Sequence, residues 1–317
     1  MARPELNFRE GSARDLANTF ALSERAIHDV AVRTGVMPAG TAPTDATIRS
    51  NWLRQRNMVE FLAAQPGGRY RLAEDDEGRL VAYARVVRFN GMEQLTELMV
   101  APRNQREGIG RELLERCWPG KPTREVGRLV VAAGAPADLT LYPDFGVMPV
   151  TGHWHLRVRT ERYLERRAKE RDVQEPGTHV LSPPRAVSEW QRLEPLAIAH
   201  ERAELHEFFG RDRTCLATMT EAGEATALCW VSTRGEIGPA VGAEPQHLVP
   251  VVLAALDRVA KTQEPDELSL FCTTIAWWLL RRLRGLGFRV YWPSWVMCSV
   301  PLPGLDRYVP TRPPHVL

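Results

Sequence analysis

The stretch VAPRNQREGIGR, residues 100–111, is the most informative part of this sequence. An apolar run ends at Pro102, and an amphipathic segment with leucines on one face begins where the stretch ends. This order predicts a strand, a polar turn and a helix. The first turn of a helix has unpaired N–H groups and the positive end of the helix dipole, so it favours a phosphate. Gly108 and Gly110 have no Cβ, which lets the backbone come close to a ligand.

Two common phosphate-binding motifs do not fit this loop. The P-loop of nucleoside triphosphatases requires a lysine and a hydroxyl residue after its last glycine, whereas Arg111 and Glu112 follow Gly110. The dinucleotide-binding fingerprint requires three glycines, and this loop has two. The loop therefore predicts an anion site of another class.

The loop resembles the acetyl-coenzyme A (acetyl-CoA) loop of the GNAT N-acetyltransferase superfamily. The family pattern is Gln/Arg-x-x-Gly-x-Gly/Ala after a strand that ends in Val-x-Pro. Gln105, Gly108 and Gly110 occupy its three fixed positions, and the residues up to Pro102 match the strand end. An ordinary strand–turn–helix corner is the alternative interpretation of the loop taken alone.

A second family motif, Tyr-x-x-x-Gly-Phe, follows the next buried strand, at residues 128–133. Tyr142 and Gly146 match it, whereas Val147 replaces the usual aromatic residue. Pro143 is expected to end the preceding helix directly after the tyrosine. A buried tyrosine with a structural hydrogen bond is the alternative.

The order of the predicted elements agrees with the resemblance over residues 5–159, and the second half repeats the plan. The expected fold class is α/β, of the α+β kind, with two tandem GNAT-like domains. Each would have a mixed, mostly antiparallel central sheet flanked by helices. The chain has 317 residues, too many for one such domain. The expected limits are 1–160 for the acetyl-CoA-binding domain, 161–184 for a linker and 185–317 for the second domain.

Hydrophobic periodicity and turn residues predict the individual elements. In the first half we expect strands at 6–9, 69–74, 80–87, 95–100, 128–133 and 151–155, and helices after Ser12, after Thr44 and from Arg111. In the second half we expect strands at 214–220, 225–232, 235–241, 268–273 and 295–300, and helices at 188–209, 247–261 and 275–286. The charged residues 157–172 are predicted to form a solvated linker helix.

The second half lacks the glycine loop and the tyrosine, although Gly287 and Phe288 match the Gly-Phe that ends the second motif. Residues 241–246 read VGAEPQ, without the glycine pattern, and Leu283 stands four places before Gly287, where the first half has a tyrosine. The second copy is therefore predicted to be degenerate, and the chain to have one cofactor site, in its first half.

Composition excludes several classes of protein. The formal net charge of +2 gives no argument for binding nucleic acid or an anionic membrane. No apolar run is long enough to span a membrane, and residues 1–5 lack the apolar core of a signal peptide, so we expect a cytoplasmic protein. The five cysteines are scattered, without a Cys-x-x-Cys pair, which predicts buried reduced thiols and no metal site.

The resemblance implies an acetyl-CoA-dependent N-acetyltransferase that moves an acetyl group directly to a small-molecule amine. The end of the strand before the loop would pair with the pantetheine arm and supply an N–H to polarise the thioester carbonyl. Tyr142 would donate a proton to the leaving sulfur. The implied cofactor-binding residues are Leu98, Met99, Val100, Gln105, Arg106, Glu107, Gly108, Ile109, Gly110 and Arg111.

The resemblance also implies that a general base can come from the strand before the loop. Glu93 and Glu97 are expected to share one face by period-two alternation, as bases or, equally, as surface carboxylates. His153 and His155 also share a face of their predicted strand. They would either reach the acceptor pocket or, by the favoured interpretation, face solvent.

Two alternatives to the amine acetyltransferase stay open. A non-catalytic acyl-CoA sensor or scaffold is motivated by Pro143 and Val147, which depart from the family motif. An amino-sugar or thiol-cofactor acetyltransferase resembling mycothiol synthase is also tandem, although that enzyme's active half is the second. The sequence identifies no acceptor amine and is compatible with a monomer or a homodimer.

Overall fold

The computed structural model describes residues 5–170, 177–312 and 317, and the chain forms two compact units. Unit 1 comprises Met1–Met148 and Met297–Val300, and unit 2 comprises Pro149–Val296 and Pro301–Leu317. These units differ from the expected limits 1–160, 161–184 and 185–317. The reasons are that residues 149–159 belong to unit 2, where residues 153–159 pair with a strand of that unit, and that residues 297–300 join unit 1.

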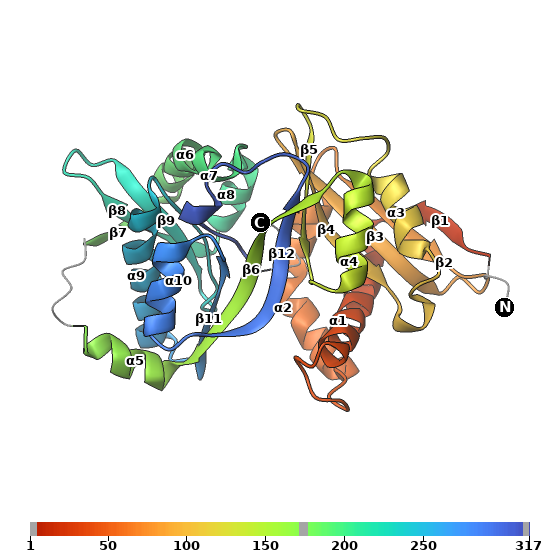
Figure 1. The fold of residues 1–317 in the computed structure, drawn as a ribbon, viewed down its shortest axis with the longest axis horizontal. Helices are drawn as coiled ribbons and strands as arrows, with labels where there is room; N and C mark the ends of the chain where they lie inside the picture. Colours follow the sequence, from red (N-terminus) through yellow and green to blue (C-terminus); the bar gives the residue numbers. More distant parts are fainter. Residues whose placement is uncertain (1–4, 171–176, 313–316) are drawn as a thin grey trace. The chain divides into compact units, whose positions relative to one another are not determined.

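Unit 1 is built on a mostly antiparallel sheet. Its strands follow one another in sequence order, and the fifth strand joins the fourth in parallel. Ser299, from the far end of the chain, donates its N–H to the carbonyl of Arg128 at 2.9 Å. The strands are β1 (Asn7–Glu10), β2 (Arg69–Glu74), β3 (Leu80–Phe89), β4 (Met92–Val100) and β5 (Gly127–Ala132); the helices are α1 (Leu16–Arg33), α2 (Asp45–Ala63), α3 (Ile109–Cys117) and α4 (Pro136–Leu141) (Figure 1).

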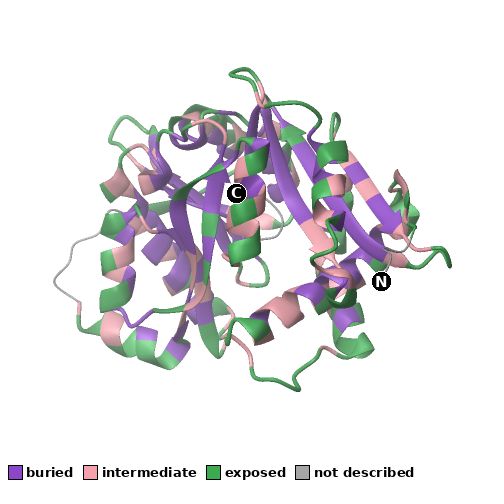
Figure 2. Cartoon of the chain, turned by 45° about the vertical axis from the view of Figure 1, so that its right-hand side comes forward, coloured by how far each residue is buried: buried purple, intermediate pink, exposed green. Residues whose placement is uncertain are grey.

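Helices cover both faces of this sheet. Alternation along β3 directs Ala82, Ala84 and Val86 into the core under α3, and Tyr83 into the core under α1 and α2. The strands are accordingly buried, and exposed residues gather on the outer sides of the helices (Figure 2). The predicted strands and helices of the first half are confirmed, although β4 begins at Met92 rather than Leu95.

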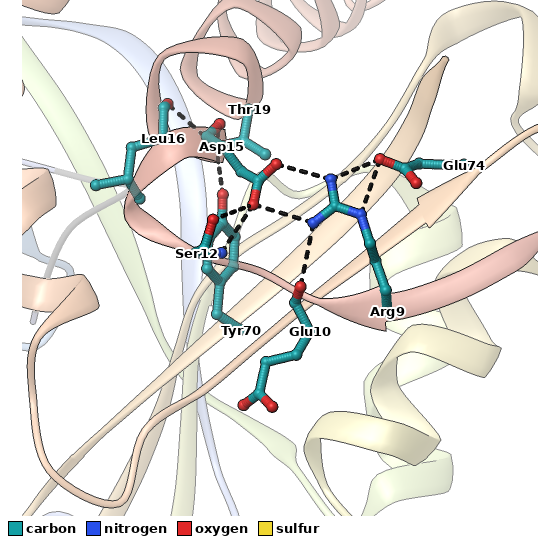
Figure 3. Close-up of polar contacts among 8 residues, drawn as sticks. All are labelled: Arg9, Glu10, Ser12, Asp15, Leu16, Thr19, Tyr70 and Glu74. Atoms are coloured by element: carbon teal, nitrogen blue, oxygen red, sulfur yellow. Dashed lines mark hydrogen bonds and ion pairs between the residues drawn. The ribbon is translucent and has the colours of Figure 1, made fainter. Parts of the chain in front are cut away.

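Two ion pairs of Arg9 fix the start of α1 to the sheet (Figure 3). Arg9 on β1 donates to Asp15 at 2.7 Å and to Glu74 on β2 at 2.6 Å. The N–H and the hydroxyl of Ser12 both donate to Asp15 Oδ2 at 2.8 Å. The predicted helix start at Ser12 is confirmed as a 3-10 turn (Ala13–Asp15) that leads into α1.

Unit 2 has a five-stranded antiparallel sheet and a second group of strands. The sheet order is β13-β10-β9-β8-β7, and β6 pairs with β11 and neighbours β12. The strands are β6 (Met148–Arg159), β7 (Thr178–Leu181), β8 (Arg213–Met219), β9 (Ala225–Ser232), β10 (Ile237–Gly242), β11 (Glu267–Thr273), β12 (Arg289–Cys298) and β13 (Tyr308–Val309). The helices are α5 (Thr160–Ala168), α6 (Pro183–Leu193), α7 (Pro195–Ile198), α8 (Ala203–Phe209), α9 (Leu248–Thr262) and α10 (Trp277–Gly285).

Two predictions for unit 2 are wrong in part. The helix expected at 188–209 is broken into α6, α7 and α8, because Pro195 starts a new helix and Ala199 adopts a left-handed φ of 62°. The charged segment after residue 157 forms α5 but is not a solvated linker. Its Tyr163 is fully buried and donates to Asp257 on α9 at 2.6 Å.

All five cysteines are buried and unpaired, as predicted. Burial raises the pKa of each thiol, for Cys117 to about 12, so these thiols are poor nucleophiles at neutral pH. In the part of the chain that the structure describes, no helix is long and apolar enough to cross a membrane.

Candidate functional site

The strands β4 and β5 part halfway along their length. Their parallel pairing runs from Met92 opposite Gly127 to Leu95 opposite Val130, and no further pair joins them in the described chain. The rest of β4 stays paired with β3 up to Val100. The edge of β4 that faces β5 therefore has backbone groups without ladder partners, and such groups need a partner.

A β-bulge lies where the two strands separate. On β3, Val86 faces Leu95, but the next residue, Arg85, faces Glu97, so Thr96 is an extra residue in β4. The hydroxyl of Thr96 donates to the carbonyl of Arg85 at 3.2 Å. A bulge of this kind bends a strand and increases its twist, which turns the end of β4 away from β5.

The bulge overturns the prediction that Glu93 and Glu97 share a face. Glu93 lies on the α3 side, where it pairs with Arg69 at 2.8 Å. Glu97 lies on the α1 side, where it accepts from the hydroxyl of Tyr83 at 2.9 Å and pairs with Arg85 at 2.9 Å. The surface-carboxylate alternative is also wrong, because the side chains of Glu93 and Glu97 are only 7% and 3% exposed.

The Arg85–Glu97 pair belongs to a buried polar network. The guanidinium of Arg85 lies 4.7 Å from the centre of the Tyr70 ring, and the Tyr70 hydroxyl is 2.7 Å from that of Thr19 on α1. Burial lowers the pKa of Arg85, but the nearby charge of Glu97 outweighs it and the net pKa is raised. The network links β3, the bulge of β4 and α1.

The loop after β4 has the backbone of an anion cradle. Arg106 and Gly108 adopt left-handed φ angles of 68° and 82°, and α3 begins at Ile109. Only glycine adopts such a φ without strain, which explains Gly108. The first-turn N–H groups of α3 have no partners within the helix, and alternating right- and left-handed residues form a concave nest of N–H groups.

Gly110 connects this loop to the free end of β4. A Cβ on Gly110 would lie 3.7 Å from the side chain of Leu98 and 3.8 Å from that of Val100. The first turn of α3 therefore lies against the residues that follow the bulge. Of the predicted cofactor residues, Gly110 thus lies beside Leu98 and Val100, whereas Ile109 is buried in the core under α3.

Gln105 and Arg111 have structural partners. The side chain of Gln105 donates to the carbonyl of Val100 at 3.2 Å and accepts from Arg33 at 2.8 Å. Arg111 pairs with Asp144, which follows α4. Gln105 therefore ties the loop to β4 and α1, and Arg111 ties α3 to the segment after α4.

Tyr142 lies at the end of α4. As predicted, Pro143 stops the α-helix: α4 ends at Leu141 and a 3-10 turn (Tyr142–Phe145) follows. Gly146 has a φ of 78°, and a Cβ there would come within 2.8 Å of Pro122, so the motif glycine is required. Val147 is fully buried in the core under α3.

The Tyr142 side chain is only 5% exposed, and its hydroxyl has no hydrogen-bond partner within the described residues. The alternative of a structural hydrogen bond is thus not supported there. Burial, followed by the charge of Asp138, raises the pKa of Tyr142 well above its usual value. The hydroxyl is therefore protonated at neutral pH and free to donate.

His153 and His155 lie in unit 2 and share a face of β6, as predicted, because both rings stack on Phe271. The favoured solvent-facing interpretation is wrong: His153 is fully buried and its Nδ1 lies 2.9 Å from the Ser294 hydroxyl. Burial lowers the pKa of each imidazole to about 3, so both are neutral.

The corresponding turn of unit 2, before α9, has a different build. A Cβ on Gly242 would come within 2.7 Å of the Glu244 carbonyl, and Pro250 removes one N–H from the first turn of the helix. The carboxylate of Glu244 beside this turn pairs with Arg307 at 3.8 Å. The crowding at Gly242 and the missing N–H disfavour an anion there.

The sequence match with a known protein family includes the residues of the unit 1 site. Residues 66–146, which run from before β2 to Gly146, match the sequence profile of the acetyltransferase (GNAT) domain. No curated protein sequence matches the chain significantly.

Solved structures match the chain over both units. A candidate acetyltransferase from Pyrococcus horikoshii is 16% identical with a TM-score of 0.70, and the match covers 100% of this chain and 98% of that one. A tandem GNAT protein from the clavulanic acid biosynthesis pathway is 18% identical with a TM-score of 0.57, covering 94% and 99%. A GCN5-related N-acetyltransferase from Sphaerobacter thermophilus is 17% identical with a TM-score of 0.56, covering 93% and 96%. At these identities the likeness shows the fold, which confirms the predicted fold class.

Proposed function

We propose that this chain transfers an acetyl group from acetyl-CoA to a small-molecule amine. Its residues 66–146 match the GNAT acetyltransferase domain, and it has the fold of tandem GNAT proteins. One observation carries the proposal: the parted strands, the anion cradle and a buried tyrosine with a free hydroxyl occur together in unit 1. The acceptor is proposed only as a class.

The cofactor would bind along the surface formed by β4 and the loop. The pyrophosphate would accept from the N–H groups of residues 105–111, at the positive end of the α3 dipole. The pantetheine arm would pair with the free edge of β4 at Leu98, Met99 and Val100, as an added strand does. One N–H of this edge would hold the thioester oxygen as negative charge develops on it.

Tyr142 would supply the proton for the leaving group. The amine attacks the thioester carbonyl, the C–S bond breaks, and the sulfur takes the hydroxyl proton of Tyr142. The attacking nitrogen loses a proton to water, and the tyrosinate regains one from water. The raised pKa of Tyr142 keeps this proton in place until the thiolate forms.

Neither carboxylate is proposed to contact the amine. Glu93 is ion-paired with Arg69 under α3, and both oxygens of Glu97 are engaged by Tyr83 and Arg85. Glu97 instead holds the bulge, and the amine binds in its neutral form.

The test is acetyl-CoA binding and turnover by the purified full-length protein. We expect Gly108→Asp to weaken acetyl-CoA binding at least about tenfold, because it strains a left-handed residue and places a carboxylate in the anion cradle. Calorimetry measures the affinity, and a thiol reagent measures CoA released with a panel of amines.

Gly223→Asp is the matched control. Gly223, in a hairpin turn of unit 2, has the same φ of 82° and equally open space, so it carries the backbone strain without the cradle. If the wild-type protein neither bound acetyl-CoA nor released CoA with any amine, the proposal would fail.

A non-catalytic acyl-CoA sensor is the second candidate. It is favoured by Pro143, which places Tyr142 in a 3-10 turn instead of the α-helix. Tight CoA binding without turnover across the panel would support the sensor.

A further inference from the structure

Unit 2 repeats the split-sheet plan of unit 1. In each unit four strands follow one another in sequence order across the sheet, and a helix follows the fourth strand: α3 follows β4, and α9 follows β10. β10 also has a β-bulge, because it advances three residues from Ile237 to Ala240 while its partner β9 advances two. β11, which corresponds to β5, lies in a different sheet from β10. β10 is therefore the counterpart of β4 with its free edge.

Residues 302–311, which we call the closing segment, cover that edge of β10. Its strand β13 (Tyr308–Val309) forms an antiparallel ladder with Ala240 and Val241, on the side of β10 away from β9. On the other side of the split, the hydroxyl of Thr273 at the end of β11 donates to the carbonyl of Leu305 at 2.6 Å. The closing segment thus contacts both of the parted strands, and its backbone pairs with the edge that is unpaired in unit 1.

The turn after β10 also has the opposite polarity to the loop after β4. Arg307 of the closing segment donates to the carbonyl of Ala243 in this turn and pairs with Glu244 at 3.8 Å. In unit 1 the corresponding loop presents N–H groups at the start of α3, which suit an anion. A turn that presents a carbonyl and a carboxylate suits a cation instead, and the cation bound there belongs to the chain itself.

The closing segment is anchored like a core strand. Tyr308 and Val309 are fully buried, and Val309 packs in the core under α9. The Tyr308 hydroxyl accepts from Arg202, which pairs with Glu194 at 2.5 Å, and the two charged side chains are each 1% exposed. Release of the closing segment would expose apolar surface and take a hydrogen-bond partner from this buried ion pair, both of which are costly.

We propose that the closing segment is a built-in substitute for acetyl-CoA in unit 2, an inference that rests on the function proposed above. β13 occupies the edge where unit 1 would bind the pantetheine arm, and Arg307 occupies the turn where unit 1 would bind the pyrophosphate. Unit 2 is therefore complete without a ligand, and its cofactor place is closed by the chain itself. The chain binds one acetyl-CoA, in unit 1.

Hydrogen exchange of the full-length protein, with and without saturating acetyl-CoA, reads the two edges separately. Mass spectrometry follows peptides that cover β4 and β10. We expect β10 to be protected already without acetyl-CoA and its exchange to change less than about twofold when acetyl-CoA is added. Exchange of the unpaired N–H groups at the end of β4 slows at least about tenfold on binding, because this edge gains a partner. Calorimetry gives a stoichiometry of one acetyl-CoA for each chain.

Arg307→Glu loosens the closing segment, because it places a second carboxylate beside Glu244 and against the Ala243 carbonyl. We expect exchange in β10 to become at least about tenfold faster, while the affinity for acetyl-CoA stays within about twofold. Arg258→Glu, which makes the same change at an exposed position of α9, leaves the exchange of β10 as in the wild type.

A milder pair of variants covers the case in which Arg307→Glu does not fold. Thr273→Val removes only the hydrogen bond to Leu305, and we expect it to speed the exchange of β10 about threefold. Thr226→Val, whose hydroxyl lies 2.8 Å from that of Thr218 on β8, is the matched control and leaves this exchange unchanged.

Three results would overturn the built-in substitute and leave the acetyltransferase standing. They are exchange of β10 as fast as that of an exposed turn, slowing of that exchange by acetyl-CoA, and two acetyl-CoA molecules bound to each chain. Wild-type exchange of β10 in both Arg307→Glu and Thr273→Val would have the same consequence. A wild-type protein that binds no acetyl-CoA would overturn both proposals.

Discussion

Tyr142 shows how the end of a helix sets the state of one hydroxyl group. Pro143 stops α4, and Gly146 turns the chain so that Val147 fills the core where the family motif has an aromatic ring. The tyrosine is buried by this packing without gaining a hydrogen bond in the described chain. Burial thus protects the proton that the proposed reaction needs.

We expect Tyr142→Phe to lower kcat about 100-fold, because it removes the proton donor for the leaving thiolate. The affinity for acetyl-CoA stays near wild type, since the change removes one oxygen and keeps the ring. Steady-state kinetics and calorimetry measure the two quantities. Tyr291→Phe in unit 2 serves as the control, and an unchanged kcat in Tyr142→Phe would remove this residue from the mechanism.

At the scale of elements, β4 is held in two ways along its length. Before the bulge it is an ordinary strand between β3 and β5, and after the bulge it pairs with β3 alone. The Arg85–Glu97 pair lies at the transition, with both side chains almost fully buried. A buried ion pair stabilises little by itself, but loss of one partner leaves the other charge uncompensated.

Glu97→Gln is therefore expected to lower the free energy of unfolding by about 3–5 kcal/mol, because the Arg85 charge stays buried without its counter-charge. Urea denaturation measures this change. The double variant Arg85→Met/Glu97→Leu recovers most of the stability, since two apolar side chains replace the pair. Equal stability of Glu97→Gln and wild type would contradict this account.

The double variant also separates stability from activity. If the pair sets the bulge, and the bulge presents the N–H groups of β4, the stable double variant has a reduced kcat. Retained activity would assign the pair to stability alone.

Local patterns predicted most elements but not their irregularities. Period-two alternation carries no mark of an extra residue, so the bulge at Thr96, and with it the separation of Glu93 from Glu97, was not predictable. Pro195 itself indicated the helix break, since proline interrupts a helix. The apolar periodicity on both sides of Pro195 nevertheless favoured one continuous helix.

The candidate site was likewise predictable only in part. Sequence motifs located the loop and Tyr142, because glycines and the tyrosine stand at fixed spacings. The partners of these residues come from tertiary contacts that no spacing encodes. Arg33 on α1 donates a hydrogen bond to Gln105. Asp138 is one turn from Tyr142, and burial raises the pKa of its carboxyl group.

For the whole molecule, buried imidazoles set how stability depends on pH. Burial lowers the pKa values of His153 and His155 to about 3, against an unfolded value of 6.5. Between these values the unfolded chain binds more protons than the folded one, so acidification favours unfolding. Asp15, whose pKa is lowered to about 2 by Arg9, adds a loss of stability below its unfolded value of 3.8.

We therefore expect the free energy of unfolding to be highest above about pH 6.5 and to fall steadily toward pH 3. Denaturant titrations at a series of pH values measure this slope. A His153→Gln/His155→Gln variant has a shallower slope between pH 6.5 and 4, whereas His179→Gln, at an exposed position, keeps the wild-type slope. Equal slopes in all three proteins would contradict the assignment.

The four residues Met297–Val300 belong to unit 1, although the rest of that unit ends at residue 148. Through Ser299 they close the outer edge of β5. Because these residues come so late in the chain, unit 1 lacks the partner of this strand edge until residues 297–300 have been made. A fragment that ends before residue 297 would leave backbone groups of β5 unpaired.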